Sequence, residues 1–128
     1  MAKRFSATEL WEEDWFLDMP TEYKLFWFYM LSACNHAGFY RLNLRRFCST
    51  NEVKIDPKKA IELFNKGKKR VTELKDDLWY VEDFIVFQYG DKLNMKNRVH
   101  KSIVEYLNKF NIKAKDVRGL IEVKEGSN

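Results

Sequence analysis

A helical repeat of apolar residues dominates residues 21–35. The apolar residues that share one side of this segment fall at the spacing i, i+3, i+4, i+7, i+8 and i+11: Tyr23, Phe26, Trp27, Met30, Leu31 and Cys34. This spacing is typical of an amphipathic helix that packs on a core. Leu25, Phe28 and Tyr29 extend the apolar surface beyond that side, so the helix must be covered from more than one direction. We expect the segment that carries Trp11 and Trp15, together with a C-terminal helix, to cover it.

A short strand and a second helix are expected next. Gly38 follows the apolar repeat and is of the residue type that ends helices in the left-handed conformation. Residues 39–42 then read as a short extended segment. Asn43 is predicted as the N-cap of a helix of about two turns over residues 44–49, which would bury Phe47.

A third helix is predicted between Asp56 and Gly67. Asp56 is a good N-cap, Pro57 fits the first helical position, and Gly67 suits the end of the segment. The apolar face of this helix is narrow and consists of Ala60, Ile61 and Phe64. The opposite face is polar and mostly basic: Lys58, Lys59, Glu62, Asn65 and Lys66. Such a helix would pack one side on a core and present lysines on the other.

A β-hairpin is predicted over residues 69–81. Residues 69–74 and 78–81 are rich in Val, Thr, Trp and Tyr, and the intervening Lys75, Asp76 and Asp77 suit a turn. The alternation of apolar and polar residues in the two strands is imperfect. The run that follows, FIVFQYG, fits either a strand or a short helix by its period.

A final amphipathic helix begins near residues 94–97. Val99, Ile103, Tyr106 and Phe110 fall at i, i+4, i+7 and i+11. Residues 112–128 have weak periodicity and end in EGSN, so we expect a flexible tail or linker there. The chain is thus predicted to hold one domain over residues 1–111, followed by that tail.

The order of these elements predicts the fold class. Helix, short strand, short helix, turn, helix, hairpin and helix form a winged helix-turn-helix in outline, an α+β fold that is mainly α, with an extra C-terminal helix. In this fold the third helix enters the major groove of DNA while the hairpin follows the adjacent backbone.

The distribution of charge agrees with a polyanion partner. The chain has a net charge of +4 and a sequence pI near 9.0. Residues 41–70 hold ten Lys or Arg and three Asp or Glu, a net charge of +7, so the rest of the chain sums to −3. We predict Lys58, Lys59 and Lys66 at the groove and Arg45, Arg46, Lys68, Lys69 and Arg70 at phosphates. The full predicted DNA-binding set also includes a residue of the turn before the third helix: Lys54.

Three segments also resemble a known group of proteins. The runs EYKLFWFYMLSACNHAGFYRLN, DLWYVEDFIVFQYG and NRVHKSIVEYL look like the N-terminal domain of phage and prophage replication proteins, the replisome-organiser or DnaD-like group. The resemblance covers most of residues 5–110. It implies a winged-helix fold and DNA binding at a replication origin, often beside a second domain that recruits the helicase-loading machinery.

Other chemistry has little support in the sequence. Cys34, His36, Cys48 and His100 do not have the spacing of a common zinc site, so no metal and no cofactor is expected. The sequence has no phosphate-binding glycine loop and no pairing of His with a nucleophile, and we expect no enzyme activity. The two cysteines suit buried thiols in a reducing compartment. The absence of a long apolar run or an evident signal peptide predicts a cytoplasmic protein.

Two alternatives to an origin-binding function remain open at this point. The chain is suited to act as a protein-interaction module of a replication complex, with the apolar first helix as the docking surface. It is equally suited to be a transcriptional regulator, because an operator and an origin are read by the same physics. Besides double-stranded DNA, the candidate partners are therefore a replisome protein such as a helicase loader and a second copy of the chain as a homodimer.

Overall fold

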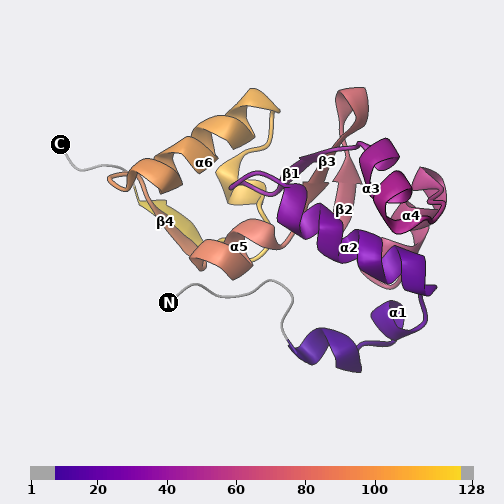
Figure 1. Cartoon of the computed structure of the whole chain (residues 1–128). Coiled ribbons are helices and arrows are strands. Elements are labelled where there is room, and N and C mark those ends of the chain that lie inside the picture. Colours follow the sequence, from indigo (N-terminus) through magenta and orange to yellow (C-terminus); the bar gives the residue numbers. More distant parts are fainter. Residues whose placement is uncertain (1–7, 125–128) are drawn as a thin grey trace.

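The computed structural model describes residues 8–124 and has a mainly helical α+β architecture (Figure 1). The first part of the chain contains a 3-10 helix, four α-helices, three strands and a turn of 3-10 helix: η1 (Thr8–Glu12), α1 (Asp14–Leu17), α2 (Thr21–Ala33), β1 (Phe39–Arg41), α3 (Leu44–Asn51), α4 (Pro57–Phe64), β2 (Val71–Glu73), η2 (Lys75–Asp77) and β3 (Leu78–Val81). The second part follows directly: α5 (Phe84–Tyr89), β4 (Lys92–Asn94), α6 (Arg98–Lys109), η3 (Ala114–Asp116) and β5 (Glu122–Lys124).

Strands β1, β3 and β2 form one antiparallel sheet in that spatial order. In β3, Tyr80 pairs with Phe39 of β1 on one side and with Thr72 of β2 on the other. The predicted hairpin is confirmed as β2 and β3. Its turn places Asp76 and Asp77 at positive φ, +60° and +59°, a conformation that aspartate tolerates better than most residues.

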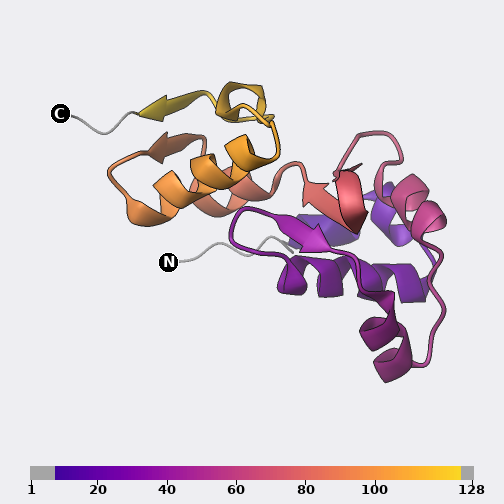
Figure 2. The same ribbon diagram turned by 90° about the horizontal axis from the view of Figure 1, so that it is seen from above.

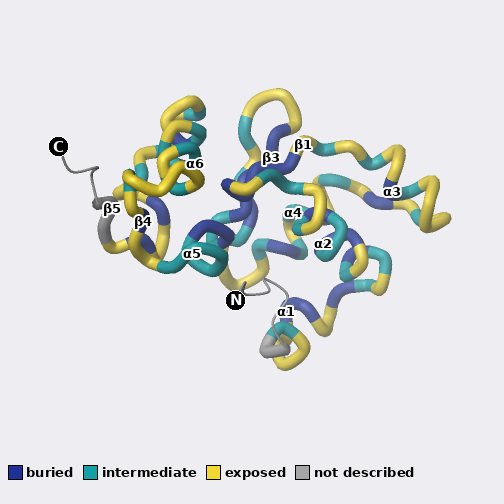
Figure 3. Tube along the Cα trace, turned by 60° about the vertical axis from the view of Figure 1, so that its left-hand side comes forward, coloured by how far each residue is buried: buried dark blue, intermediate teal, exposed yellow. Residues whose placement is uncertain are grey.

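The imperfect alternation in the hairpin has a structural cause, because β3 is buried on both faces. Trp79 and Val81 face a first core with α1 to α4, whereas Leu78 and Tyr80 face a second core with α5, α6 and η3. Figures 1 and 2 show these two groups of helices on opposite sides of the sheet, and Figure 3 shows β3 as a buried segment between more exposed ones. A strand covered on both faces needs no polar side, so its sequence does not alternate.

The first core forms around α2, as its apolar repeat predicts. Phe26 and Met30 are fully buried there, and Phe26 lies 5.2 Å from Phe47 and 6.0 Å from Phe64, measured between ring centroids. The N-terminal segment covers another side of α2, where Trp15 contacts Trp27 with ring centroids 5.2 Å apart. The prediction that this segment covers the helix is therefore confirmed. The prediction that the C-terminal helix covers it too is wrong, because Ile103 and Leu107 of α6 pack in the second core instead.

Both α4 and α3 begin where the sequence predicts, but only α4 has a side-chain cap. The Asp56 carboxylate accepts a hydrogen bond of 3.1 Å from the amide of Lys58, and Pro57 is the first helical residue, as predicted. Asn43 occupies the N-cap position of α3, as predicted, but its side chain makes no capping bond. Its own amide donates to the Tyr40 hydroxyl at 3.3 Å.

Gly38 belongs to a turn rather than to the end of a helix. Helix α2 ends at Ala33, and the side chain of Asn35 then accepts hydrogen bonds from the amides of Ala37 and Phe39. Gly38 has φ +88° within this turn, and its carbonyl accepts the amide of Val81 in β3. The glycine is needed at a junction between α2 and the sheet.

Residues 112–124 are more structured than the tail expected from residue 112. Val117 and Leu120 are buried in the second core, and β5 pairs with β4 in parallel. The apolar residues of this segment follow neither a helical nor a strand period, yet two of them are buried in the same core as residues of α5 and α6. Residues 125–128 of the predicted tail lie outside the described residues.

None of the helices in residues 8–124 has the length and apolarity that crossing a lipid bilayer requires.

We expect the thiol of Cys34 to react slowly in the folded chain. It is half-buried and donates to the carbonyl of Leu31 at 3.2 Å. Burial raises its pKa to about 11, an effect that the backbone hydrogen bond only partly offsets. At pH 8 only about one thiol in a thousand is then ionised. Alkylation by iodoacetamide, followed by peptide mass spectrometry, should be at least about tenfold slower at Cys34 in the native chain than in urea. Equal rates would contradict this assignment.

Candidate nucleic-acid interface

Helix α4 carries two of the predicted lysines, and a third follows it. Ala60 and Phe64 are fully buried on one side of the helix, so Lys58 lies on its exposed side. Lys66 is exposed two residues beyond the end of the helix. Lys59 is also exposed, and its ammonium lies 5.5 Å from the ring centroid of Tyr23. A cation–π contact at an exposed site is weak, about 0.5–1 kcal/mol, and does not neutralise the ammonium, so its charge stays available to a partner.

The remaining exposed cations of the predicted set lie on α3 and on the two connections that flank α4. Helix α3 buries Phe47, and Arg45 and Arg46 are exposed on it. Lys54 is exposed between α3 and α4. Within the described residues, seven of the nine predicted cations make no side-chain hydrogen bond or ion pair: Arg45, Arg46, Lys54, Lys58, Lys59, Lys66 and Lys69. These seven charges are not neutralised within the described part of the chain.

Arg70 is engaged within the fold, unlike the exposed cations of the predicted set. Its Nη1 donates to the carbonyls of Phe64, Lys66 and Lys68 at 3.1, 2.8 and 3.2 Å. Its guanidinium also lies 4.0 Å from the ring centroid of Trp15. The side chain therefore ties the connection after α4 to the N-terminal segment, and these contacts leave less of its guanidinium for a phosphate. Burial lowers its pKa, although the neighbouring carboxylates of Glu13 and Asp83 oppose that effect.

Asn65 fixes the same connection from the other side. Its side-chain oxygen accepts the amides of Arg70 and Val71 at 2.7 and 2.9 Å, and its side-chain nitrogen donates to the carbonyl of Val71 at 3.0 Å. Asn65 was assigned to the polar face of the helix from sequence. Its three bonds instead close the chain between α4 and β2, so Asn65 and Arg70 together hold the connection between these two elements.

Lys68 is engaged in an ion pair. Its ammonium lies 2.9 Å from one oxygen of Asp83, while Nε of Arg118 donates to the other oxygen at 2.9 Å. Arg118 also donates to the carbonyl of Lys69. Burial raises the pKa of Asp83, but the bonds from Arg118 and Lys68 outweigh it and hold the pKa below the ordinary value. Lys68 is thus partly neutralised, whereas the side chain of Lys69 stays exposed and unpaired among the described residues.

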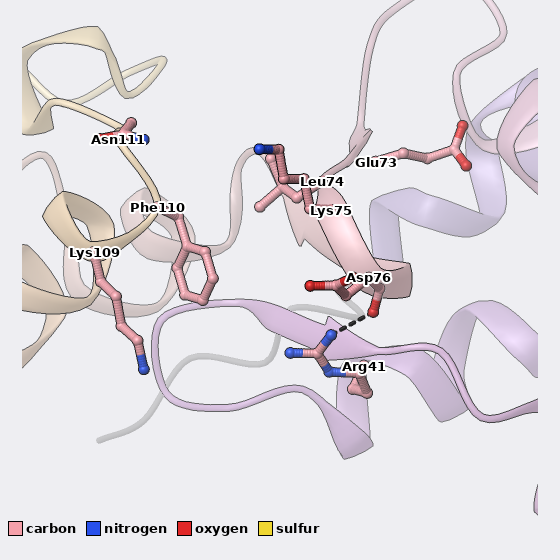
Figure 4. A pocket seen from close by; sticks show the side chains of 8 residues that line it. All are labelled: Arg41, Glu73, Leu74, Lys75, Asp76, Lys109, Phe110 and Asn111. Carbon is pink, nitrogen blue, oxygen red and sulfur yellow. Dashed lines mark hydrogen bonds between the residues drawn. The ribbon is translucent and has the colours of Figure 1, made fainter.

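A cleft on the far side of the hairpin was not predicted. It has a volume of about 570 Å³ and lies between the β2–β3 turn and the C-terminal end of α6 (Figure 4). Arg41 and Lys75 line it from the sheet, and Lys109 and Phe110 line it from α6. The sequence gives no signal for it, because residues 41, 75 and 109 are distant in the chain and only the fold brings them together.

The histidines serve structural contacts. His36 Nε2 lies 2.9 Å from the hydroxyl of Ser102, which in turn donates to the carbonyl of Val99. The amide of Asn94 donates to Nδ1 of His100 at 2.9 Å. Residues 8–124 contain no group of three or more His, Cys, Asp or Glu side chains that could hold a metal ion.

Comparison with known proteins adds no assignment. The resemblance to phage replication proteins and the DNA-binding role therefore rest on the residues described above. No known protein family, curated protein or solved structure matches this chain.

Proposed function

We propose that the chain binds double-stranded DNA as a winged helix-turn-helix domain, with α4 in the major groove. The observation that carries this proposal is a group of exposed lysines in and just after α4: Lys58 and Lys59 lie in its first turn, and Lys66 lies two residues beyond its end. Arg45, Arg46, Lys54 and Lys69, on α3 and on the connections that flank α4, would contact phosphates. Arg70 is left out of the interface, and Lys68 would contribute less than a free lysine.

The topology supports the same proposal. A helix, a strand, a helix pair and a hairpin follow one another, and β1 pairs with the second strand of the hairpin. In a winged helix this order places the second helix of the pair against DNA and the hairpin beside it. In the proposed winged helix, α3 and α4 would be that pair, and β2 and β3 would be that hairpin.

The biological setting that we propose is replication initiation of the phage type, in the cytoplasm. It rests on the resemblance of three segments to replisome organisers, and a helicase loader is the protein partner it implies. A transcriptional regulator would use the same interface. Selection of bound fragments from phage or prophage DNA distinguishes the two, because an initiator should recover an origin and a regulator an operator.

Replacing Lys58 and Lys59 together with alanine should weaken duplex binding at least about tenfold. The loss of two phosphate or groove contacts should also reduce the slope of log affinity against log salt by about 1.8. Fluorescence anisotropy with a labelled duplex of about 30 base pairs measures both quantities. The matched control replaces Lys113 and Lys115, which are exposed but lie after α6. Unchanged affinity in the first variant, or equal losses in both, would remove α4 from the interface.

Exposed apolar residues near the N-terminus favour a second candidate, a protein-docking module. Trp11, Leu25 and Leu17 are 52%, 45% and 42% exposed. Exposed side chains of this size are typical of surfaces that meet another protein. Absence of duplex binding even at low salt would favour this second function over the first.

A further inference from the structure

The cleft beside the hairpin has the size and composition of a ligand site. Its volume of about 570 Å³ falls within the roughly 300–1,000 Å³ of small-molecule pockets. One wall is the β2–β3 turn, and the other is the end of α6 (Figure 4). Both walls include a residue in left-handed backbone, Asp76 with φ +60° in the turn and Asn111 with φ +62° after α6. Asp and Asn adopt this conformation more readily than most residues, so it fixes the shape of the two walls without unusual strain.

An aromatic ring lies at the centre of the cleft. Phe110 is partly buried and is supported from behind by Phe39 and Tyr106, with ring centroids 5.1 and 5.4 Å away. Figure 4 shows its ring between Lys109 and the hairpin turn. A supported ring of this kind provides a flat surface on which a nucleic-acid base can stack.

Three cations line the cleft with this ring. Lys109 places its ammonium 5.7 Å from the ring centroid of Phe110, Arg41 reaches the cleft from β1, and Lys75 reaches it from the turn. The guanidinium of Arg41 is oriented by a hydrogen bond to the carbonyl of Asp76 and keeps its other N–H groups for a ligand (Figure 4). These groups can contact the phosphates on either side of a stacked base.

The acidic residues do not cancel this charge. Glu73 lines the cleft but its carboxylate points away from the ring and the cations (Figure 4). The carboxylate of Asp76 faces the cleft, so three cations remain against one anion. Asp76 and the amide of Asn111 offer an acceptor and a donor for the edge of a base.

We propose that this cleft binds one nucleotide of single-stranded DNA, with the base on Phe110 and its phosphates at Lys109, Arg41 and Lys75. A base in a duplex is stacked on its neighbours and has no free face for the ring, so the ligand must be unpaired. This site goes beyond the duplex binding proposed above and does not depend on α4. It would place an unpaired strand next to the hairpin.

The test compares single-strand and duplex binding in the same variants. Anisotropy of a labelled oligothymidine of about 20 nucleotides should show binding that Lys109→Gln and Lys75→Gln each weaken about three- to tenfold. Phe110→Leu should weaken it about tenfold through lost stacking. The control is Lys101→Gln, which removes the same charge from α6 outside the cleft and should change affinity less than about twofold. The Lys58→Ala, Lys59→Ala variant should lose duplex affinity and keep oligothymidine affinity.

The outcomes separate the two proposals. No binding of oligothymidine by the unmodified chain at low salt, or equal losses in Lys101→Gln and Lys109→Gln, would overturn the cleft site and leave duplex binding untouched. Photocrosslinking with 5-iodouracil in the oligonucleotide should mark residues 109–111, and crosslinks confined to α4 would overturn the site as well. Because Phe110 also packs on Phe39, a melting curve checks that variant. If it is unfolded, the two lysine variants decide.

Discussion

Replacing Gly38 with alanine should destabilise the fold more than any other change proposed here. A Cβ at this position would lie 2.8 Å from Cβ of Phe84, closer than real Cβ contacts come, and φ is +88°. The left-handed conformation costs about 1–2 kcal/mol for alanine, and crowding of the core adds about 1–3 kcal/mol. We expect a loss of about 2–5 kcal/mol in the free energy of unfolding. Thermal denaturation should show Tm lower by about 10 °C or more.

Gly67→Ala separates the two causes. Gly67 has φ +77°, but nothing lies within 4 Å of the Cβ that alanine would add. This variant should lose only the conformational part, about 1 kcal/mol. If both variants lost the same amount, contact with Phe84 would contribute nothing, and the proposed role of Gly38 at the junction would be wrong.

Replacing Arg70 with alanine should cost about 2–3 kcal/mol of stability, because three carbonyls lose a charged donor and Trp15 loses a stacked cation. The carbonyls of Phe64, Lys66 and Lys68 lie at and beyond the C-terminal end of α4. A cation there also interacts favourably with the negative end of the helix dipole. Urea denaturation measures the effect. Lys69→Ala is the matched control, since the neighbouring side chain is exposed, and it should change stability by less than about 0.5 kcal/mol.

Arg70→Lys distinguishes structure from phosphate contact. Lysine keeps the charge but loses the planar guanidinium that reaches several carbonyls and stacks on Trp15. We therefore expect most of the stability loss to persist in this variant. The opposite result would be an Arg70→Lys variant as stable as the unmodified chain, together with DNA affinity that is lost in Arg70→Ala and kept in Arg70→Lys. That result would support the phosphate contact first predicted for Arg70.

Local signals in the sequence predict much of the first part of the fold. The apolar residues of α2 follow one helical period, and Asp56 with Pro57 predicts the observed start of α4. The hairpin is predicted because Asp76 and Asp77 suit a turn between two strands. In each case the residues that decide the conformation lie within a few positions of one another.

Long-range contacts explain what the sequence does not predict. Val117 and Leu120 become core residues only because α5 and α6 leave space for them. Arg70 counts as a surface cation until Trp15, far away in the chain, is known to lie against it. The cleft at Phe110 likewise combines residues from three separate elements. The charge of a residue and the spacing of apolar residues carry no information about contacts between segments that are far apart in the chain.

The double burial of β3 limits how the hairpin can move. Turning this strand outward would withdraw Trp79 and Val81 from one core and Leu78 and Tyr80 from the other at the same time. The hairpin therefore behaves as a fixed ridge rather than as a flap. In the DNA complex that we propose, the hairpin could not adjust its position to the duplex, so any adjustment between the two would have to come from the DNA. Sequences that deform easily would then be bound more tightly at positions the protein never touches.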